Sequence, residues 1–192
     1  MTRLRQICCE PRMLYENYKG ESTKFTMCLE LIETLKENGK KVLLFSSFTS
    51  IFDSFIEEFN QRGIKYHMIT GAVDKKKRKE EVDAFQSDDS DVFLISLKAG
   101  GTGLNLTKAQ AVIHYDPWWN VSAQNQATDR AYRIGQTKNV LVYQLLMKNT
   151  IEAKIYEMQK RKKEMSDIFV ENSNGGISTL SKEELRDLFS ME

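Results

Sequence analysis

The chain has 192 residues, of which 41% are hydrophobic and 29% are charged, and its formal net charge is +1. This composition is ordinary for a soluble globular protein, and the length suits one sizeable domain with an extension. The sequence shows neither a signal peptide nor an apolar stretch of membrane-spanning length, so we expect no membrane partner.

The cysteines and histidines form no metal or disulfide pattern. Cys8, Cys9 and Cys28 lack zinc-type spacing, and the adjacent pair can hardly bridge without strain. His67 and His114 each end an apolar run and are interpreted as strand residues rather than ligands. A reducing, intracellular setting fits this pattern best.

Short apolar runs alternate along the chain with amphipathic segments. The expected strands are Val42–Phe45, Tyr66–Thr70, Val92–Ser96, Ala111–Tyr115 and Val140–Leu146. Most are continuously apolar, as expected when helices cover both faces of a parallel sheet. The alternation predicts a doubly wound α/β domain, whose ligands gather at the carboxyl ends of the strands.

Four helices are expected between these strands, and capping residues indicate their ends. They are a helix from the N-cap Ser22 to Asn38, one through Phe52 and Phe59 that stops at Gly63, one from the cap Asp74 to Phe85, and Val121–Ile134.

Both ends of the chain read as extensions of this domain. The basic segment Leu4–Ile7 looks structured, which leads to the hypothesis that Met1 begins a piece cut from a longer protein. From Thr150 a long charged helix is predicted, with its apolar side formed by Ile151, Ile155, Met158 and Met165.

The segment Ser96–Leu106 follows the third expected strand and holds three glycines in four positions. Such a loop lets successive backbone amides face an anion, although a tight structural turn is an open alternative. The sequence contains no G-x-x-x-x-G-K-[ST] loop and no acidic D-E-x-H box for magnesium. The chain therefore lacks the usual cradle for a nucleoside triphosphate.

Gln126, Arg130 and Arg133 have the spacing i, i+4 and i+7, so a helix places them on one edge. The planar guanidinium suits phosphate oxygens, and two of them on one helix can stabilise charge on a transferring phosphoryl group. The alternative is a surface ion pair between Asp129 and Arg133, with Arg130 solvated.

Taken in order, these segments resemble the second RecA-like lobe of superfamily-two helicases, and more narrowly that of the Swi/Snf DNA-dependent ATPases. The matching segments are Val42–Phe48 (fourth motif), Ser96–Leu106 (fifth), the marker Tyr115–Asn120 with its D-P-W-W-N sequence, and Gln126–Gln136 (sixth). Two positions depart from the family pattern. Val121 replaces a common proline, and Ala72 removes a hydroxyl that often follows Gly71.

The resemblance implies a nucleotide role for one group of residues. Arg130 and Arg133 would reach the β/γ-phosphates of ATP bound with Mg²⁺ mainly by a separate first lobe, and Gln126 would help to position their helix or the nucleotide. Gly101 and Gly103 would let the loop approach the nucleotide and DNA sides of the cleft. The isolated chain is expected to hydrolyse ATP negligibly.

The resemblance also implies a nucleic-acid face. The residues expected there are Ser46, Gly71 and Ser96, which would contact backbone phosphates, together with Lys98, Trp118 and Trp119. For the two tryptophans, packing beneath the sixth-motif helix is an open alternative. The basic run Lys75–Lys79 reads either as a solvated helix face or as a further contact to duplex DNA.

We therefore expect an α/β, RecA-like three-layer domain with a parallel sheet, made of a lead-in helix (1–20), the lobe (21–147) and a C-terminal brace helix with a tail (148–192). The expected function is the second motor lobe of a translocase on double-stranded DNA, partnered by the first lobe of the same protein. The chain alone is expected to be a monomer or a weak crystal dimer, and the whole protein to be intracellular and DNA-associated. A non-catalytic docking module and an RNA helicase lobe are the alternatives.

Overall fold

Five parallel strands form the centre of the computed structural model, which describes residues 2–100, 104–118, 121–131 and 139–173. The strands are β1 (Lys41–Ser46), β2 (Tyr66–Ile69), β3 (Val92–Ser96), β4 (Ala109–His114) and β5 (Leu141–Gln144). Their order across the sheet is β2-β3-β1-β4-β5, and each neighbouring pair is parallel. The predicted parallel sheet is confirmed, and its strands end within two residues of the predicted positions.

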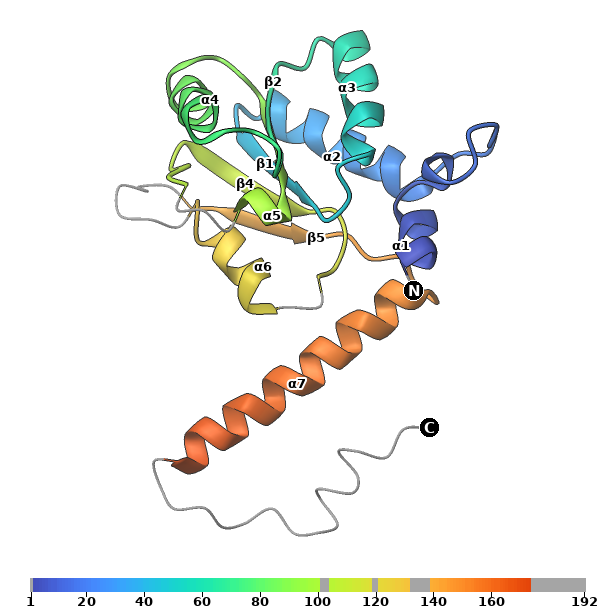
Figure 1. Ribbon diagram of the computed structural model, residues 1–192, viewed down its shortest axis with the longest axis vertical. Coiled ribbons are helices and arrows are strands. Elements are labelled where there is room, and N and C mark those ends of the chain that lie inside the picture. The colour runs from blue at the N-terminus through green and yellow to red at the C-terminus, as the bar shows by residue number, and fades with distance from the viewer. Residues whose placement is uncertain (1, 101–103, 119–120, 132–138, 174–192) are drawn as a thin grey trace.

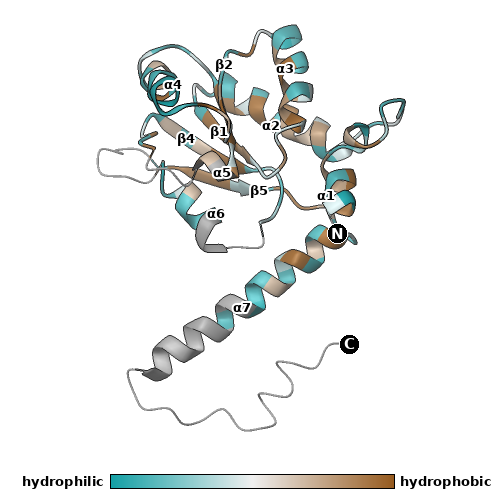
Figure 2. Ribbon diagram, in the orientation of Figure 1, coloured by the Kyte–Doolittle hydropathy of each residue, from teal (hydrophilic) through white to brown (hydrophobic). Residues whose placement is uncertain are grey.

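Alternate strand residues build two hydrophobic cores, one on each face of the sheet. Leu44 and Leu94 belong to one core, whereas their neighbours Leu43 and Phe93 belong to the other. The helices that cover the sheet are α2 (Thr23–Glu37), α3 (Ile51–Arg62), α4 (Lys75–Ser87), α5 (Leu97–Gly100) and α6 (Val121–Thr128). The first two pack on one face and the other three on the opposite face, which gives three layers. Figure 2 shows hydrophobic residues concentrated on the sheet and hydrophilic ones on α4.

Capping residues set the helix ends largely as predicted. The side chain of Asp74 accepts hydrogen bonds from the amides two and three residues further on, at the start of α4. Gly63 ends α3 with a φ of 60°, a left-handed conformation that favours glycine. Ser22 precedes α2 but makes no side-chain cap, because its hydroxyl donates instead to the carbonyl of Cys9 at 3.4 Å.

The helix predicted over Val121–Ile134 is wrong in its length, because α6 ends at Thr128. The amide of Arg130 donates to the carbonyl of Ala127, three residues back, so the chain leaves α-helical hydrogen bonding in a tight turn. The carbonyl of Arg130 in turn accepts from the amide of Leu106 at 3.1 Å. This contact fixes the turn against the segment that leads into β4.

The two ends of the chain form helices that meet beside the sheet. At the N-terminus, α1 (Thr2–Cys9) is followed by the short 3₁₀ helix η1 (Pro11–Met13), so the predicted lead-in helix over 1–20 is wrong in its extent. Glu10 is extended, with a φ of −162°, as is common for a residue before proline. At the other end, α7 (Ile151–Ser173) contacts α1 at its start and runs away from the sheet (Figure 1).

The predicted apolar side of α7 is only partly buried. Ile155 is fully buried, whereas Met158 on the same side of the helix is 56% exposed. Glu152 takes a fully buried place on this helix, because it has a cationic partner on α2. Among the described residues, no helix combines the length and apolar character needed to cross a bilayer.

Candidate functional site

The carboxyl ends of β1, β3 and β4 bring several predicted site residues together. Ser46 and Ser96 are register partners at the ends of β1 and β3. Both are buried, with exposed fractions of 0% and 3%. The Ser46 hydroxyl donates to Asp116 at 2.8 Å, and the Ser96 hydroxyl accepts from the amide of Ala99 at 3.4 Å. The nucleic-acid roles of these serines stay predictions, and their hydroxyls hold the loops together in this conformation.

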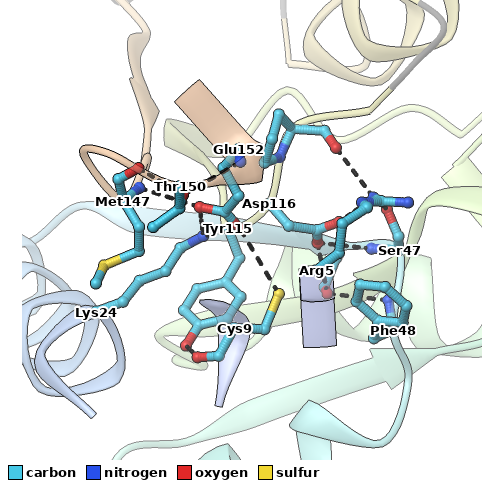
Figure 3. Close-up of polar contacts among 12 residues, drawn as sticks. Arg5, Cys9, Lys24, Ser47, Phe48, Tyr115, Asp116, Met147, Thr150 and Glu152 are labelled. Carbon is cyan, nitrogen blue, oxygen red and sulfur yellow. Dashed lines mark hydrogen bonds and ion pairs between the residues drawn. The ribbon is translucent and has the colours of Figure 1, made fainter. Parts of the chain in front are cut away.

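Asp116 is a site residue for which the sequence analysis assigned no role. One carboxylate oxygen, Oδ1, accepts from the Ser46 hydroxyl and from the amide of Ser47 at 2.9 Å. The other oxygen, Oδ2, forms an ion pair with Arg5 at 2.9 Å (Figure 3). Connections leave β1 and β4 in opposite directions, which makes this position the crevice where α/β sheets bind ligands. The D-P-W-W-N pattern marked the segment that contains Asp116, but no local sequence signal indicated that Arg5 is its partner.

Gly71 and Lys98 lie near this edge on neighbouring elements. Gly71 is exposed in the turn after β2, next to the exposed Ala72. Lys98 lies within α5, directly after β3, and its side chain lies outside the described residues. Gly101 and Gly103 also lie outside the described residues, so their predicted roles stay untested.

The arginine segment differs from the predicted helix edge. Gln126 is exposed on α6, whereas Arg130 is 4% exposed and lies beyond the end of that helix. The two residues therefore do not share one helix edge, and the alternative of a solvated Arg130 is also wrong. Arg133 lies outside the described residues. Arg130 is held through its backbone to Leu106, at the far end of the glycine-rich segment.

His114 joins the end of β4 to the end of α6. Its Nε2 lies 2.8 Å from the hydroxyl of Thr128, which also lies 3.3 Å from the carbonyl of Gln124. Burial lowers the pKa of His114 to about 4, so the imidazole is neutral at physiological pH. The prediction of a strand residue is confirmed. We infer that this contact helps to fix the turn that carries Arg130.

Trp118 follows the crevice and covers one core. It is partly buried and packs against the core that contains Ala127 and Ala131. Its amide donates to the side chain of Gln124 at 3.4 Å. This arrangement agrees with packing beneath the α6 segment, while Trp119 lies outside the described residues.

A second buried ion pair lies where α7 meets the lobe. The ammonium group of Lys24 contacts both oxygens of Glu152 at 2.7 Å, and the amide of Met147 donates to the same carboxylate at 3.1 Å. The hydroxyl of Tyr115 donates to the carbonyl of Cys9 at 2.6 Å. Burial raises the pKa of both the Tyr115 hydroxyl and the Cys9 thiol. These contacts bind α1, α2 and α7 to the end of β4 (Figure 3).

The basic run at the start of α4 forms an exposed patch. Lys75, Lys76, Lys77 and Lys79 are exposed, and Arg78 is half-buried and donates to the carbonyl of Val73 at 3.2 Å. Among the described residues, no group of three or more histidine, cysteine, aspartate or glutamate side chains is placed to hold a metal ion.

Comparison with known proteins decides the family. The helicase conserved C-terminal domain family matches residues 23–135. The chain belongs to this family. An uncharacterized ATP-dependent helicase of Mycoplasma pneumoniae is 42% identical over 192 residues, which cover 97% of this chain and 18% of the relative. The putative ATP-dependent helicase/translocase YwqA of Bacillus subtilis is 37% identical over 98% of this chain and 21% of its own length.

Solved structures agree with this family. The SWI2/SNF2 ATPase core of Sulfolobus solfataricus, in complex with dsDNA, is 31% identical and matches with a TM-score of 0.73, over 100% of this chain and 41% of that chain. The helicase C-terminal domain described here is thus a RecA-like lobe of the Swi/Snf type, as the sequence resemblance implied. It spans about a fifth of the length of the curated relatives it matches.

Proposed function

We propose that this domain is the second motor lobe of an ATP-dependent translocase on double-stranded DNA. In this proposal Arg130 and Arg133 act as arginine fingers toward ATP and Mg²⁺ held mainly by a first lobe. The observation that carries the proposal is the anchoring of the Arg130 turn to two neighbouring elements, through Leu106 and through Thr128 with His114. The sequence family and the dsDNA complex of the Sulfolobus relative support it.

The proposed chemistry follows from what the chain has and lacks. Its sequence contains no P-loop, and its described residues form no carboxylate cluster for magnesium. The lobe would therefore supply positive charge to a nucleotide bound elsewhere. A guanidinium placed on the transferring phosphoryl group stabilises the negative charge that develops in the transition state. Gln126 would help to position the same segment.

The second part of the proposed site is the carboxyl edge of the sheet. The loops after β1, β2 and β3 would face the DNA backbone, with Ser46, Gly71, Ser96 and Lys98 as the predicted contacts. The Ser46 hydroxyl already donates to Asp116, so backbone amides are proposed to meet phosphates at that loop. The Ser96 hydroxyl accepts from the amide of Ala99 and keeps its own hydrogen for a phosphate oxygen. Such contacts position a motor on DNA without reading its sequence.

DNA-stimulated ATP hydrolysis by the full-length protein tests the finger assignment. Arg130→Ala and Arg133→Ala are each expected to lower the rate by about 10³–10⁵, the range for removal of an arginine finger. Arg161→Ala is the matched control, because Arg161 is exposed on α7. Unchanged hydrolysis in both finger variants would overturn the assignment.

The exposed run Lys75–Lys79 favours one other function, a non-catalytic module that docks on DNA or on another polyanion. That function predicts salt-sensitive DNA binding by this chain alone, unaffected by the Arg130 and Arg133 substitutions. A comparison of RNA with duplex DNA as activator of ATP hydrolysis tests the remaining alternative. Stronger activation by RNA would identify an RNA helicase lobe instead.

A further inference from the structure

Arg5 bridges two loops at the carboxyl edge of the sheet. Its Nη2 lies 2.9 Å from Asp116 Oδ2, 3.1 Å from the hydroxyl of Ser47 and 3.0 Å from the carbonyl of Pro117. Its guanidinium carbon lies 5.1 Å from the centre of the Phe48 ring. A single side chain on α1 thus contacts both the loop after β1 and the loop after β4 (Figure 3).

The C-terminal end of α1 is fastened to the same strand end. The hydroxyl of Tyr115 donates to the carbonyl of Cys9, the last residue of α1. Tyr115 and Asp116 are consecutive, and the residues that they hold, Arg5 and Cys9, lie about one helical turn apart. Because two positions of the helix are tied to adjacent residues, α1 and the end of β4 should move as one unit.

Because the ion pair between Arg5 and Asp116 is buried, its loss is expected to be energetically costly. The side chain of Arg5 is 11% exposed and that of Asp116 is 0% exposed. Loss of the guanidinium would leave a buried carboxylate without its cationic partner, which is costly at a desolvated site. The loops that carry Ser47 and Pro117 would then lose the donor that they share.

We propose that Arg5 is a positioning residue that holds the loops after β1 and β4 in the arrangement that engages duplex DNA. The inference rests on the proposed function. It adds a connection between α1 and DNA binding, because a displacement of α1 would be transmitted to the loops at the DNA-facing edge. Arg5 acts through Asp116, Ser47 and Pro117, and its guanidinium contacts neither nucleotide nor DNA in this scheme.

The test compares Arg5→Ala, Arg5→Lys and Arg3→Ala in the full-length protein. Arg3 is exposed on the same helix, so its substitution removes an equal charge without breaking the bridge. We expect Arg5→Ala to raise the duplex DNA concentration for half-maximal ATPase stimulation about tenfold, since the charged hydrogen bonds that hold the two loops in their DNA-engaging arrangement are lost. The rate at saturating DNA should change less than about twofold. Arg5→Lys should recover part of the loss, because it keeps the charge but lacks the planar fork.

A second readout separates positioning from general damage. This readout uses the 192-residue chain, in which Pro117 precedes both tryptophans. Release of the Pro117 carbonyl should shift their fluorescence emission in Arg5→Ala and leave it unchanged in Arg3→Ala. An Arg5→Ala variant that matches Arg3→Ala in both readouts overturns the inference, as does a loss of rate without a change in DNA dependence. Absence of any DNA stimulation in the unsubstituted protein would instead reject the proposed function, and the emission spectra would still judge the positioning role.

Discussion

Ion pairs at two regions of the lobe differ sharply in burial. Where α1, α2 and α7 meet the end of β4, the side chains of Lys24 and Glu152 are only 3% and 0% exposed. At the edge formed by β2 and α4, the side chains of Lys65 and Asp89 are 62% and 78% exposed. Buried pairs impose one geometry because each partner is costly to leave alone, whereas solvated pairs add little. The first region therefore fixes the site, and the second tolerates change.

The largest expected loss of stability follows substitution of Lys24, in the buried ion pair. Lys24→Ala leaves the buried Glu152 carboxylate without its cation, and we expect the free energy of unfolding to fall by about 3–5 kcal/mol. Urea unfolding of the chain measures the change. Lys154→Ala, an exposed lysine on α7, is the control and should leave the midpoint nearly unchanged. Removal of both charges, with Lys24→Met and Glu152→Gln, should recover part of the loss; a single variant as stable as the control would contradict the account.

A smaller effect is expected at Tyr115. Tyr115→Phe removes the hydroxyl that donates to the carbonyl of Cys9 and leaves that buried acceptor without this donor. The expected cost is about 1–3 kcal/mol in thermal or urea unfolding. Tyr15→Phe, at a side chain that is 60% exposed, provides the matched control. Equal stability of the two variants would show that the α1 contact is not fixed.

The smallest effect is expected at the β2–α4 edge and depends on pH. The imidazole of His67 lies 2.7 Å from Glu81 and 2.6 Å from Asp88. Burial alone would lower the pKa of His67, but hydrogen bonds and charges from Asp88 and Glu81 outweigh it and raise the pKa. A raised folded-state pKa means that the stabilisation is fully present below the unfolded value, about 6.5, and is lost as the pH rises through the folded value.

Measurement of the free energy of unfolding between about pH 5 and about pH 9 tests the direction of this pH dependence. This window spans about four units around the ordinary histidine pKa. His67→Gln should flatten the decline in stability above the unfolded pKa. Lys65→Ala, beside it on the same edge, should leave the pH profile unchanged because its partner Asp89 is exposed. An increase in stability with pH through that window, lost in His67→Gln, would contradict the assignment.

Sequence patterns predicted the parts of the fold that depend on local periodicity. The apolar runs, most of them continuous, placed the five strands of the described residues, and the caps Asp74 and Gly63 marked helix ends correctly. Local patterns failed at α6, which was predicted to continue to Ile134 and ends at Thr128. There a tertiary contact from Leu106 to the carbonyl of Arg130 accompanies the tight turn, and no local signal encodes it.

The candidate site shows the same division. Motif order identified the glycine-rich segment, the D-P-W-W-N marker and the arginine segment as candidate site segments. The partners Arg5 and Asp116 are 111 positions apart, and Lys24 and Glu152 are 128 apart, so spacing could not pair them. Ser46 illustrates a further limit of sequence-based prediction. The sequence suggested a hydroxyl that is available to phosphate, whereas in the structure this hydroxyl donates to Asp116.

Conversion of Arg130 to lysine in the full-length protein tests the central claim most directly. Lysine keeps the positive charge but cannot present the planar fork of donors. With ATP hydrolysis and duplex DNA binding measured on the same preparation, we expect DNA-stimulated hydrolysis to fall by at least about 10²-fold while DNA binding is retained. Hydrolysis at the unsubstituted rate would contradict the claim that this lobe supplies a finger to ATP.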